Sequence, residues 1–141
     1  MADVFTLEII SPEGQVYSGE VDEISIPTET GEVSILPHHA DLYSKVTTGE
    51  AIIHKRGKLE YIAILGGFLE LTNGNVTVLS DYAVPTDKIS QAKALEAKKR
   101  AEKLLEEKVE SQDFALIERE LQKAILELDI AEKAKRRQRS S

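Results

Sequence analysis

Residue types that could do chemistry gather between Gly31 and Leu42, in the run G-E-V-S-I-L-P-H-H-A-D-L. Two of the three histidines, His38 and His39, stand there beside Asp41. Imidazole and carboxylate groups bind metals and act as general acids and bases, so the first hypothesis is a metal or catalytic site. The alternative is an exposed loop or strand edge that contacts another protein.

Spacing argues against chemistry at this stretch. Adjacent residues in an extended segment point to opposite faces, so His38 and His39 are not expected to share one ion, and His54 or a distant carboxylate would have to supply a third ligand. No serine lies in a nucleophile-elbow motif such as G-x-S-x-G. The pair Gly66-Gly67 continues into no phosphate loop and is interpreted as a bulge or tight bend between strands. We expect a contact site with no catalytic residue, no metal and no cofactor.

Composition limits the class of protein. The 141 residues are 41% hydrophobic and 30% charged, and they include no cysteine, which excludes disulfides, thiolate zinc sites and a cysteine nucleophile. The longest apolar run, Tyr61–Leu65, is far shorter than the ~20 residues of a membrane helix. Met1-Ala2-Asp3 does not open a signal peptide, so a reducing, cytoplasmic setting is expected.

Charge divides the chain into two predicted domains. Residues 1–87 contain 14 acidic and 4 basic side chains, whereas residues 88–141 contain 11 acidic and 14 basic. Such an asymmetry indicates two parts with different partners. The acidic part is poorly suited to nucleic acid, whose phosphates attract clustered Lys and Arg.

The first part has the pattern of β-structure. Apolar residues alternate with polar ones from Val4 to Val84, and Arg56-Gly57-Lys58 and Asn73-Gly74 each separate two strand-like runs. The second part is rich in Ala, Lys, Glu and Leu, and predicts helices over 88–110 and from about Phe114 to Arg137, with Ser111–Asp113 as the turn and N-cap. The fold class is therefore α+β, with an N-terminal antiparallel β-sandwich of about ten strands followed by a C-terminal antiparallel two-helix hairpin.

The second predicted helix carries two stripes. The hairpin seam, expected to pack on the first helix, comprises Phe114, Ile117, Leu121, Ala124 and Leu128. The outer stripe comprises Leu116, Arg119, Lys123, Leu126, Ile130, Lys133 and Arg137. It would either rest on the β domain or form a surface for an acidic partner when the helix is not packed down. A seam made partly of alanine buries little apolar area, which favours an element that undocks and acts as a switch.

Two motifs resemble a known family, the ε subunit of bacterial F-type ATP synthases, which is equivalent to the mitochondrial δ subunit. The run Gly31–Leu42 is close to the family's G-E-x-G-I-L-P-x-H-A-P-L. The runs Gly66–Glu70 and Asn75–Asp81 are close to its G-G-F-L-E and N-x-V-T-V-L-A-D. The resemblance covers essentially the whole chain, including the order of sandwich and hairpin.

The resemblance implies a non-catalytic rotor subunit of the central stalk. It would bind the γ subunit and the c-ring, couple them to the α/β catalytic head, and lie peripherally at the cytoplasmic face of the bacterial inner membrane, touching the membrane only through the complex. By position, Glu32 faces the c-ring and His39 contacts γ. The helices would inhibit ATP hydrolysis by meeting an acidic segment of the catalytic β subunit, with contacts from Arg119, Lys123, Lys133 and Arg137.

One family motif is degenerate here. Some members bind ATP through I-D-x-x-R-A at the start of the first helix, where this chain has Ile89, Ser90, Lys93 and Ala94 as the corresponding residues. Serine lacks the carboxylate and lysine lacks the planar fork of arginine. We therefore expect weak ATP binding or none.

A rival hypothesis keeps the same fold without the synthase. In it the sandwich is a freestanding binding module, and the basic helix recruits an acidic or nucleic-acid partner. Salt-sensitive binding to bulk nucleic acid would favour this rival, whereas stoichiometric association with a γ-type coiled coil would favour the stalk subunit.

Overall fold

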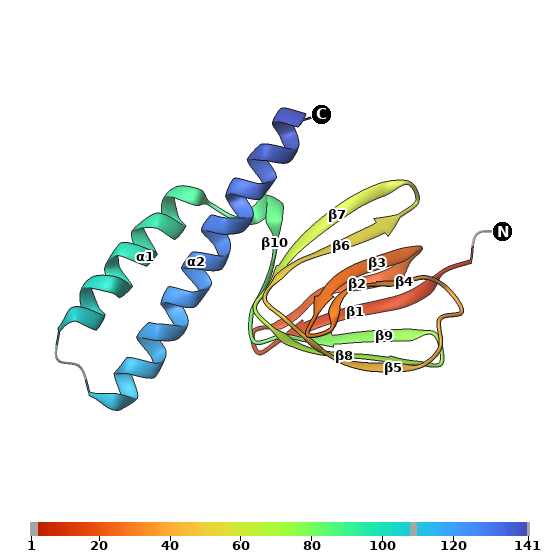
Figure 1. The fold of residues 1–141 in the computed structure, drawn as a ribbon, viewed down its shortest axis with the longest axis horizontal. Helices are drawn as coiled ribbons and strands as arrows, with labels where there is room; N and C mark the ends of the chain where they lie inside the picture. The colour runs from red at the N-terminus through yellow and green to blue at the C-terminus, as the bar shows by residue number, and fades with distance from the viewer. Residues whose placement is uncertain (1–2, 108–109, 141) are drawn as a thin grey trace. The chain divides into compact units, whose positions relative to one another are not determined.

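A computed structural model describes residues 3–107 and 110–140 of the chain (Figure 1). The chain divides into two units, Met1–Asp87 and Lys88–Ser141. Within its described residues the first unit contains ten strands, which confirms the predicted fold class. The strands are β1 (Phe5–Ser11), β2 (Gly14–Val21), β3 (Glu23–Thr28), β4 (Gly31–Ile35), β5 (Leu42–Val46), β6 (Gly49–Lys55), β7 (Lys58–Ile64), β8 (Gly67–Thr72), β9 (Asn75–Leu79) and β10 (Ala83–Pro85), followed by a short 3-10 helix, η1 (Thr86–Lys88).

The strands form one sheet that folds over itself into two layers. Their order is β10-β7-β6-β3-β5-β8-β9-β1-β2, with β4 paired to β3. β3 reaches β5 through Thr28 opposite Val46, where the sheet turns from one layer to the other. Figure 1 shows β6 and β7 in one layer and β8 and β9 in the other. The neighbours are antiparallel except for β1 and β9, which pair in parallel from Thr6 opposite Asn75 to Ile10 opposite Leu79.

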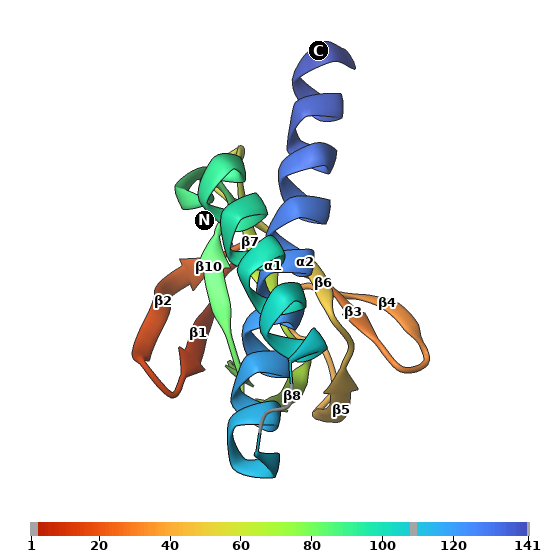
Figure 2. The ribbon, with the colours of Figure 1, turned by 90° about the vertical axis from the view of Figure 1, so that its left-hand side faces the viewer.

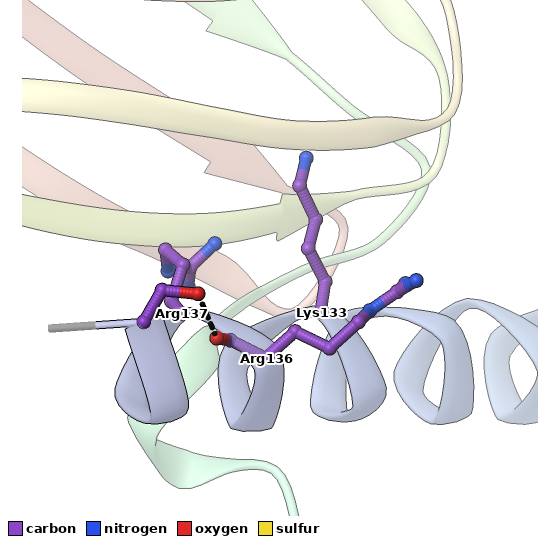
Figure 3. Close-up of a pocket in the computed structure, with 4 residues that line it drawn as sticks. Lys133, Arg136 and Arg137 are labelled. Carbon is purple, nitrogen blue, oxygen red and sulfur yellow. Dashed lines mark hydrogen bonds between the residues drawn. The ribbon is translucent and has the colours of Figure 1, made fainter.

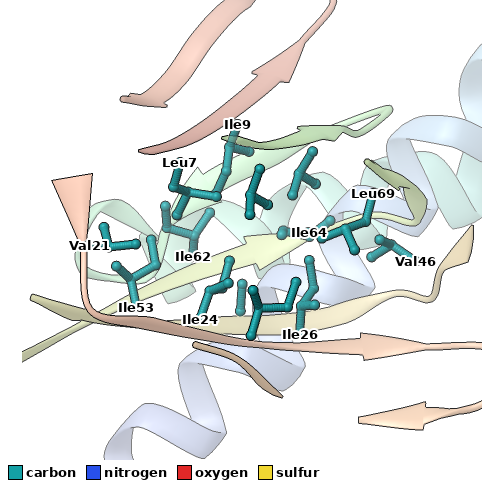
Figure 4. Close-up of a cluster of buried hydrophobic side chains, with 14 of the residues drawn as sticks. Leu7, Ile9, Val21, Ile24, Ile26, Val46, Ile53, Ile62, Ile64 and Leu69 are labelled. Atoms are coloured by element: carbon teal, nitrogen blue, oxygen red, sulfur yellow. The ribbon is translucent and has the colours of Figure 1, made fainter. Parts of the chain in front are cut away.

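Aliphatic side chains fill the space between the layers. Leu7 and Ile9 of β1 and Ile24 and Ile26 of β3 are each 0% exposed, as the period of two requires of inward positions. Figure 4 shows them in one cluster with Ile62 and Ile64 of β7. Burying each such side chain contributes about 1.5–3 kcal/mol, so this cluster is the main source of the sandwich's stability.

The predicted turns occur where glycine or a left-handed residue is required. Arg56-Gly57 and Asn73-Gly74 have positive φ at both positions (52° and 77°, 51° and 75°), as a type I′ turn demands. Gly67 (φ 132°) begins β8, and a Cβ there would lie 2.0 Å from the Leu79 carbonyl oxygen. The interpretation of the glycine pair as a tight bend is confirmed.

The second unit is a pair of helices, α1 (Gln91–Glu106) and α2 (Ser111–Ser140). They lie side by side and run in opposite directions in both Figure 1 and Figure 2. Ala94 and Ala101 of α1 and Ala124 of α2 are at most 4% exposed. Small side chains at these positions let the two backbones approach closely, as the predicted hairpin requires.

Both predicted helices have different boundaries in the structure: α1 ends at Glu106 and not at residue 110, α2 continues past Arg137 to Ser140, and both starts also differ. α1 begins at Gln91 because Ser90 keeps an extended backbone (φ −101°, ψ 111°) and its Oγ accepts a hydrogen bond from the Lys93 N–H at 3.3 Å. Ser111–Asp113 is not a turn before the second helix. The Phe114 N–H donates to the Glu110 carbonyl at 2.9 Å, so these residues already form the first turn of α2.

Candidate functional site

The two histidines lie in a turn that follows β4, which agrees with the alternative of an exposed loop. The His39 N–H donates to the Leu36 carbonyl at 3.2 Å, which closes a four-residue turn after β4. Pro37 fixes the second position, and His38 takes the third with a φ of 68°. Pro at the second position and positive φ at the third are the marks of a type II turn. A histidine occupies the position that glycine usually takes, so the backbone here is under local strain.

The two imidazoles point to different partners. His38 Nε2 lies 3.3 Å from Asp3 Oδ2, with both side chains largely exposed (81% and 70%). His39 Nδ1–H donates to the Ala40 carbonyl at 2.7 Å, which leaves Nε2 as the acceptor of the neutral ring. Over residues 3–107 and 110–140, no three His, Cys, Asp or Glu side chains are grouped so as to hold a metal ion.

Glu32 and His39, the two residues expected to dock on the rotor, are both exposed but are not brought together. Glu32 lies near the start of β4, opposite Pro27 of β3. His39 lies in the turn beyond the other end of that strand. Between them Ile35 is 1% exposed and anchors β4 to the core. The strand thus separates the two residues along one edge of the sandwich.

Sequence reasoning missed a row of apolar side chains on the outer face of the sheet. Ile10 of β1, Leu79 of β9 and Phe68 of β8 stand opposite one another, and Lys45 of β5 continues the row. Phe68 is 64% exposed and Leu79 is 52% exposed. Large apolar residues at adjacent surface positions are typical of a protein-binding face. Tyr43, 75% exposed, lies two residues from Lys45 on the same face of β5 and extends the apolar surface.

The structural role of Asp41 was also not predicted. Its Oδ1 accepts a hydrogen bond from the Asn73 N–H at 3.3 Å, which ties the loop before β5 to the turn between β8 and β9. The contact joins the run Gly31–Leu42 to the turn that lies between the runs Gly66–Glu70 and Asn75–Asp81. Asp41 therefore has a structural role through one oxygen of its carboxylate.

The sandwich contains one strongly perturbed acid among its described residues. The Tyr17 hydroxyl on β2 is shut off from solvent without a partner at hydrogen-bonding geometry. Burial, and then the carboxylate of Glu60 on β7, raise the pKa of Tyr17 to about 12, because both disfavour the phenolate. A phenol held neutral in this way cannot serve as a nucleophile or base near neutral pH.

The predicted hairpin seam is uneven. Ala124 is buried, Ile117, Leu121 and Leu128 are half-buried, and Phe114 in the first turn of α2 is 44% exposed. The alanines of both helices therefore make the closest part of the seam. A seam of this kind buries little apolar area for its length.

The outer stripe has two buried apolar members and basic members that range from half-buried to exposed. Leu126 and Ile130 are 4% and 5% exposed, whereas Leu116 is 64% exposed. Arg119, Lys123 and Arg137 are half-buried and Lys133 is exposed, with Lys123 Nζ 3.5 Å from Glu120 Oε1. Figure 3 shows Lys133 and Arg137 leaving the same side of α2, so the stripe keeps its basic character to the end of the helix.

The degenerate ATP-type motif forms a helix start. Ile89 and Ser90 precede α1, and the Ser90 carbonyl accepts from the Ala94 N–H at 2.9 Å while its hydroxyl caps Lys93. The Lys93 side chain is exposed. Serine here satisfies backbone donors of the first turn, which is a complete structural reason for its presence.

Among the described residues, neither helix is long and apolar enough to cross a membrane.

The two units match two family models. Residues 4–86 match the beta-sandwich domain of the ATP synthase delta/epsilon chain, and residues 87–132 match its long alpha-helix domain.

Curated relatives agree with the family models. The chain is 40% identical over 131 residues to the ATP synthase epsilon chains of two strains of Desulfitobacterium hafniense, Y51 and DSM 10664 / DCB-2. Each alignment covers 93% of this chain and 98% of the relative.

Solved structures share the fold. A chain of the Euglena gracilis mitochondrial ATP synthase (OSCP/F1/c-ring in rotational state 1) has a TM-score of 0.66 at 24% identity, covering 95% of this chain and 82% of that one. A chain of the Tetrahymena thermophila mitochondrial ATP synthase (central stalk/c-ring) has a TM-score of 0.51 at 10% identity, covering 60% and 68%.

Proposed function

Because the chain belongs to the ATP synthase delta/epsilon chain family, we propose that it is a non-catalytic rotor subunit of the central stalk of an F-type ATP synthase. In this role it couples the γ subunit and the c-ring to the α/β catalytic head and restrains ATP hydrolysis. The observation that carries the proposal is the joining, in one chain, of a sandwich with exposed contact surfaces to a helical hairpin held by a small-residue seam.

The sandwich is the part proposed to dock on the rotor. The apolar row of Ile10, Leu79 and Phe68 can be buried against a partner with little desolvation cost, as the centre of a stable interface requires. Glu32 and His39 lie on β4 and its following turn, where they would contact the c-ring and γ respectively. Apolar burial would provide affinity, and these two polar residues would fix the orientation.

The hairpin is the part proposed to regulate. The seam is closest at alanines, so separating or moving the helices exposes little apolar surface and requires modest free energy. Arg119, Lys123, Lys133 and Arg137 would meet an acidic segment of the catalytic β subunit. These cations form two pairs at four-residue spacing, Arg119 with Lys123 and Lys133 with Arg137, and each pair offers an acidic partner two neighbouring cations on one face of the helix.

The proposed location follows from the complex. The subunit would lie peripherally at the cytoplasmic face of the bacterial plasma membrane, held there by γ and the c-ring. It would supply no catalytic residue of its own. Its part in hydrolysis is to block or permit movement within the head.

Truncation separates coupling from inhibition. The rate of ATP hydrolysis by the cognate catalytic complex would be measured once with the full chain and once with a chain ending at Asp87. Co-purification of each chain with γ would be tested first. We expect both to bind γ and only the full chain to slow hydrolysis. Equal hydrolysis rates would refute inhibition and leave docking intact, whereas loss of γ binding by the full chain would refute the rotor role.

A further inference from the structure

The end of α2 is strongly basic, whereas the rest of the chain has a net negative charge. Residues 1–132 contain 25 acidic and 13 basic side chains, whereas residues 133–141 contain 5 basic and none acidic. The match to the family's helical domain ends at residue 132. The basic segment is thus an addition to the matched region, and α2 continues through it to Ser140.

Three of its five cations do not belong to the outer stripe. Lys135, Arg136 and Arg139, here named the tip trio, are all exposed. Arg139 follows Lys135 by four residues and Arg136 by three, so the three side chains are neighbours on the helix surface. In Figure 3, Arg136 runs along the helix while Lys133 and Arg137 leave it together on another side. The trio therefore faces away from the surface proposed to meet the catalytic head.

The helix dipole does not account for the trio. Cations are favoured near a helix C-terminus, but the effect is confined to the last turn. Lys135 and Arg136 precede the last turn of α2, which ends at Ser140. The stability of the helix end therefore does not explain why Lys135 and Arg136 are exposed cations.

An internal comparison shows what sets the trio apart. Lys99, Arg100 and Lys103 of α1 have the same spacing and are also exposed. Residues 96–107 hold four basic and four acidic side chains, so that trio is compensated locally, whereas residues 132–139 hold five basic and one acidic. Glu132, three residues before Lys135 and four before Arg136, is the one acidic side chain that neighbours the trio along α2. One carboxylate does not offset three cations, so the tip trio keeps a net positive charge.

We propose that the tip trio binds the phosphate headgroups of an anionic membrane surface. The inference rests on the proposed function, because a subunit of a membrane-bound synthase is held beside such a surface, and it adds a direct contact to the indirect one through the complex. Each Lys or Arg held near an anionic membrane surface strengthens binding about fivefold, so the three exposed cations of the trio act together. Arginine presents a planar fork to phosphate oxygens, which favours Arg136 and Arg139 as the principal contacts.

The chemistry of the segment favours lipid over nucleic acid. Residues 132–140 include no aromatic side chain on which bases could stack. The trio spans five residues, or about 6 Å of helix, which covers neighbouring headgroups but does not follow a polynucleotide backbone. The contact is weak by itself, and the complex strengthens it by holding the patch close to the membrane.

Vesicle binding by the full chain tests the proposal. Co-sedimentation would be measured with equimolar phosphatidylglycerol and phosphatidylcholine vesicles, and with phosphatidylcholine alone. Lys135→Gln/Arg136→Gln/Arg139→Gln is expected to weaken binding to the anionic vesicles roughly a hundredfold, about fivefold for each cation. Lys99→Gln/Arg100→Gln/Lys103→Gln, which changes the net charge equally, is expected to leave binding within about twofold. Arg136→Lys/Arg139→Lys should retain most of it.

Three outcomes would overturn the proposal. They are no binding of the wild-type chain to anionic vesicles, equal loss in both triple variants, and release from vesicles by single-stranded RNA at a matched or lower phosphate concentration. Circular dichroism of each variant checks that α2 is intact. Co-purification with γ is measured on the same variants, so failure of the membrane contact is distinguished from failure of the rotor role.

Discussion

The Thr86 hydroxyl donates a hydrogen bond to the Glu50 carboxylate across 2.8 Å, where Glu50 is only 7% exposed. Glu50 lies on β6, and Thr86 directly follows β10, which pairs with β7. The bond therefore fastens the last residues of the sandwich to its interior, immediately before the chain enters the helical unit.

Removing this donor should destabilise the sandwich. Thr86→Val keeps the shape of the side chain but withdraws a hydrogen bond from a buried carboxylate, which costs roughly 1–3 kcal/mol. Thr72→Val is the matched control, because Thr72 donates to Glu70 at 3.1 Å on the exposed surface, and it should cost less than about 1 kcal/mol. Urea unfolding of the full chain measures both, and equal losses would contradict the role given to Glu50.

Gly67→Ala should be among the most damaging single substitutions in the sandwich. The new Cβ would lie 2.0 Å from the Leu79 carbonyl oxygen, and backbone on both sides must move. We expect a loss of at least about 3 kcal/mol in unfolding free energy. Gly74→Ala also has positive φ but meets no atom within 4 Å, so about 1 kcal/mol is expected. A similar loss at both positions would mean that positive φ alone, and not the close approach to Leu79, determines the loss of stability.

Stability should fall at high pH through Tyr17. Its pKa is raised to about 12 in the folded chain, against about 10 for an unfolded tyrosine. The unfolded state therefore loses the proton first, so this contribution is complete below pH ~10 and disappears as the pH rises toward 12. The effect should be modest, since the ring is only partly buried. Tyr17→Phe should flatten the decline, because phenylalanine has no phenol to ionise. A decline of equal slope in Tyr17→Phe would contradict the assignment.

ATP should bind weakly or not at all to the wild-type chain. Ser90 caps α1 and the Lys93 side chain is exposed, so these two positions offer neither the carboxylate nor the planar fork of the ATP motif. Isothermal titration calorimetry measures the affinity, and a micromolar value would overturn the expectation. Ser90→Asp/Lys93→Arg keeps a good N-cap and restores both groups, so it should bind ATP more tightly than the wild type.

Charge reversal on the outer stripe should relieve inhibition. Arg119→Glu/Lys123→Glu would repel an acidic segment of the catalytic subunit and raise the hydrolysis rate of the complex roughly fivefold or more, the factor given by ~1 kcal/mol of lost contact. Arg100→Glu/Lys103→Glu on α1 should leave the rate unchanged. The unfolding free energy of the sandwich should stay within about 0.5 kcal/mol in both variants. Equal relief by both would show that net charge, and not the stripe, controls hydrolysis.

The sequence predicted the β class because its signals are local. Alternation places Leu7 and Ile9 inside, and glycine at positions 57 and 74 marks turns whose φ other residues rarely adopt. The two motifs around Gly31 and Gly66 indicated the family, which the matched domains and relatives confirm. The parallel pairing of β1 with β9 was not predicted, because no local pattern specifies which distant strand completes a sheet.

The candidate site was only partly predictable. Phe68 and Leu79 were visible as apolar residues, but the row they form depends on the register between β8 and β9. Ser90 was interpreted as a defective ligand, and its capping role emerged only from backbone geometry. The turn geometry at His38 was not predicted, because positive φ at a histidine has no sequence signal comparable to that of glycine.

The parallel pair of β1 and β9 also constrains biosynthesis. Residues Thr6–Ile10, which leave the ribosome early, complete their hydrogen bonds only with Asn75–Leu79, near the end of the sandwich. One edge of the β1–β2 hairpin therefore stays unpaired while most of the domain is translated. A nascent chain stalled before β9 exposes this edge, where a strand of another chain can pair with it. Chaperone protection of the growing chain should end abruptly once Leu79 emerges, and not gradually as each hairpin appears.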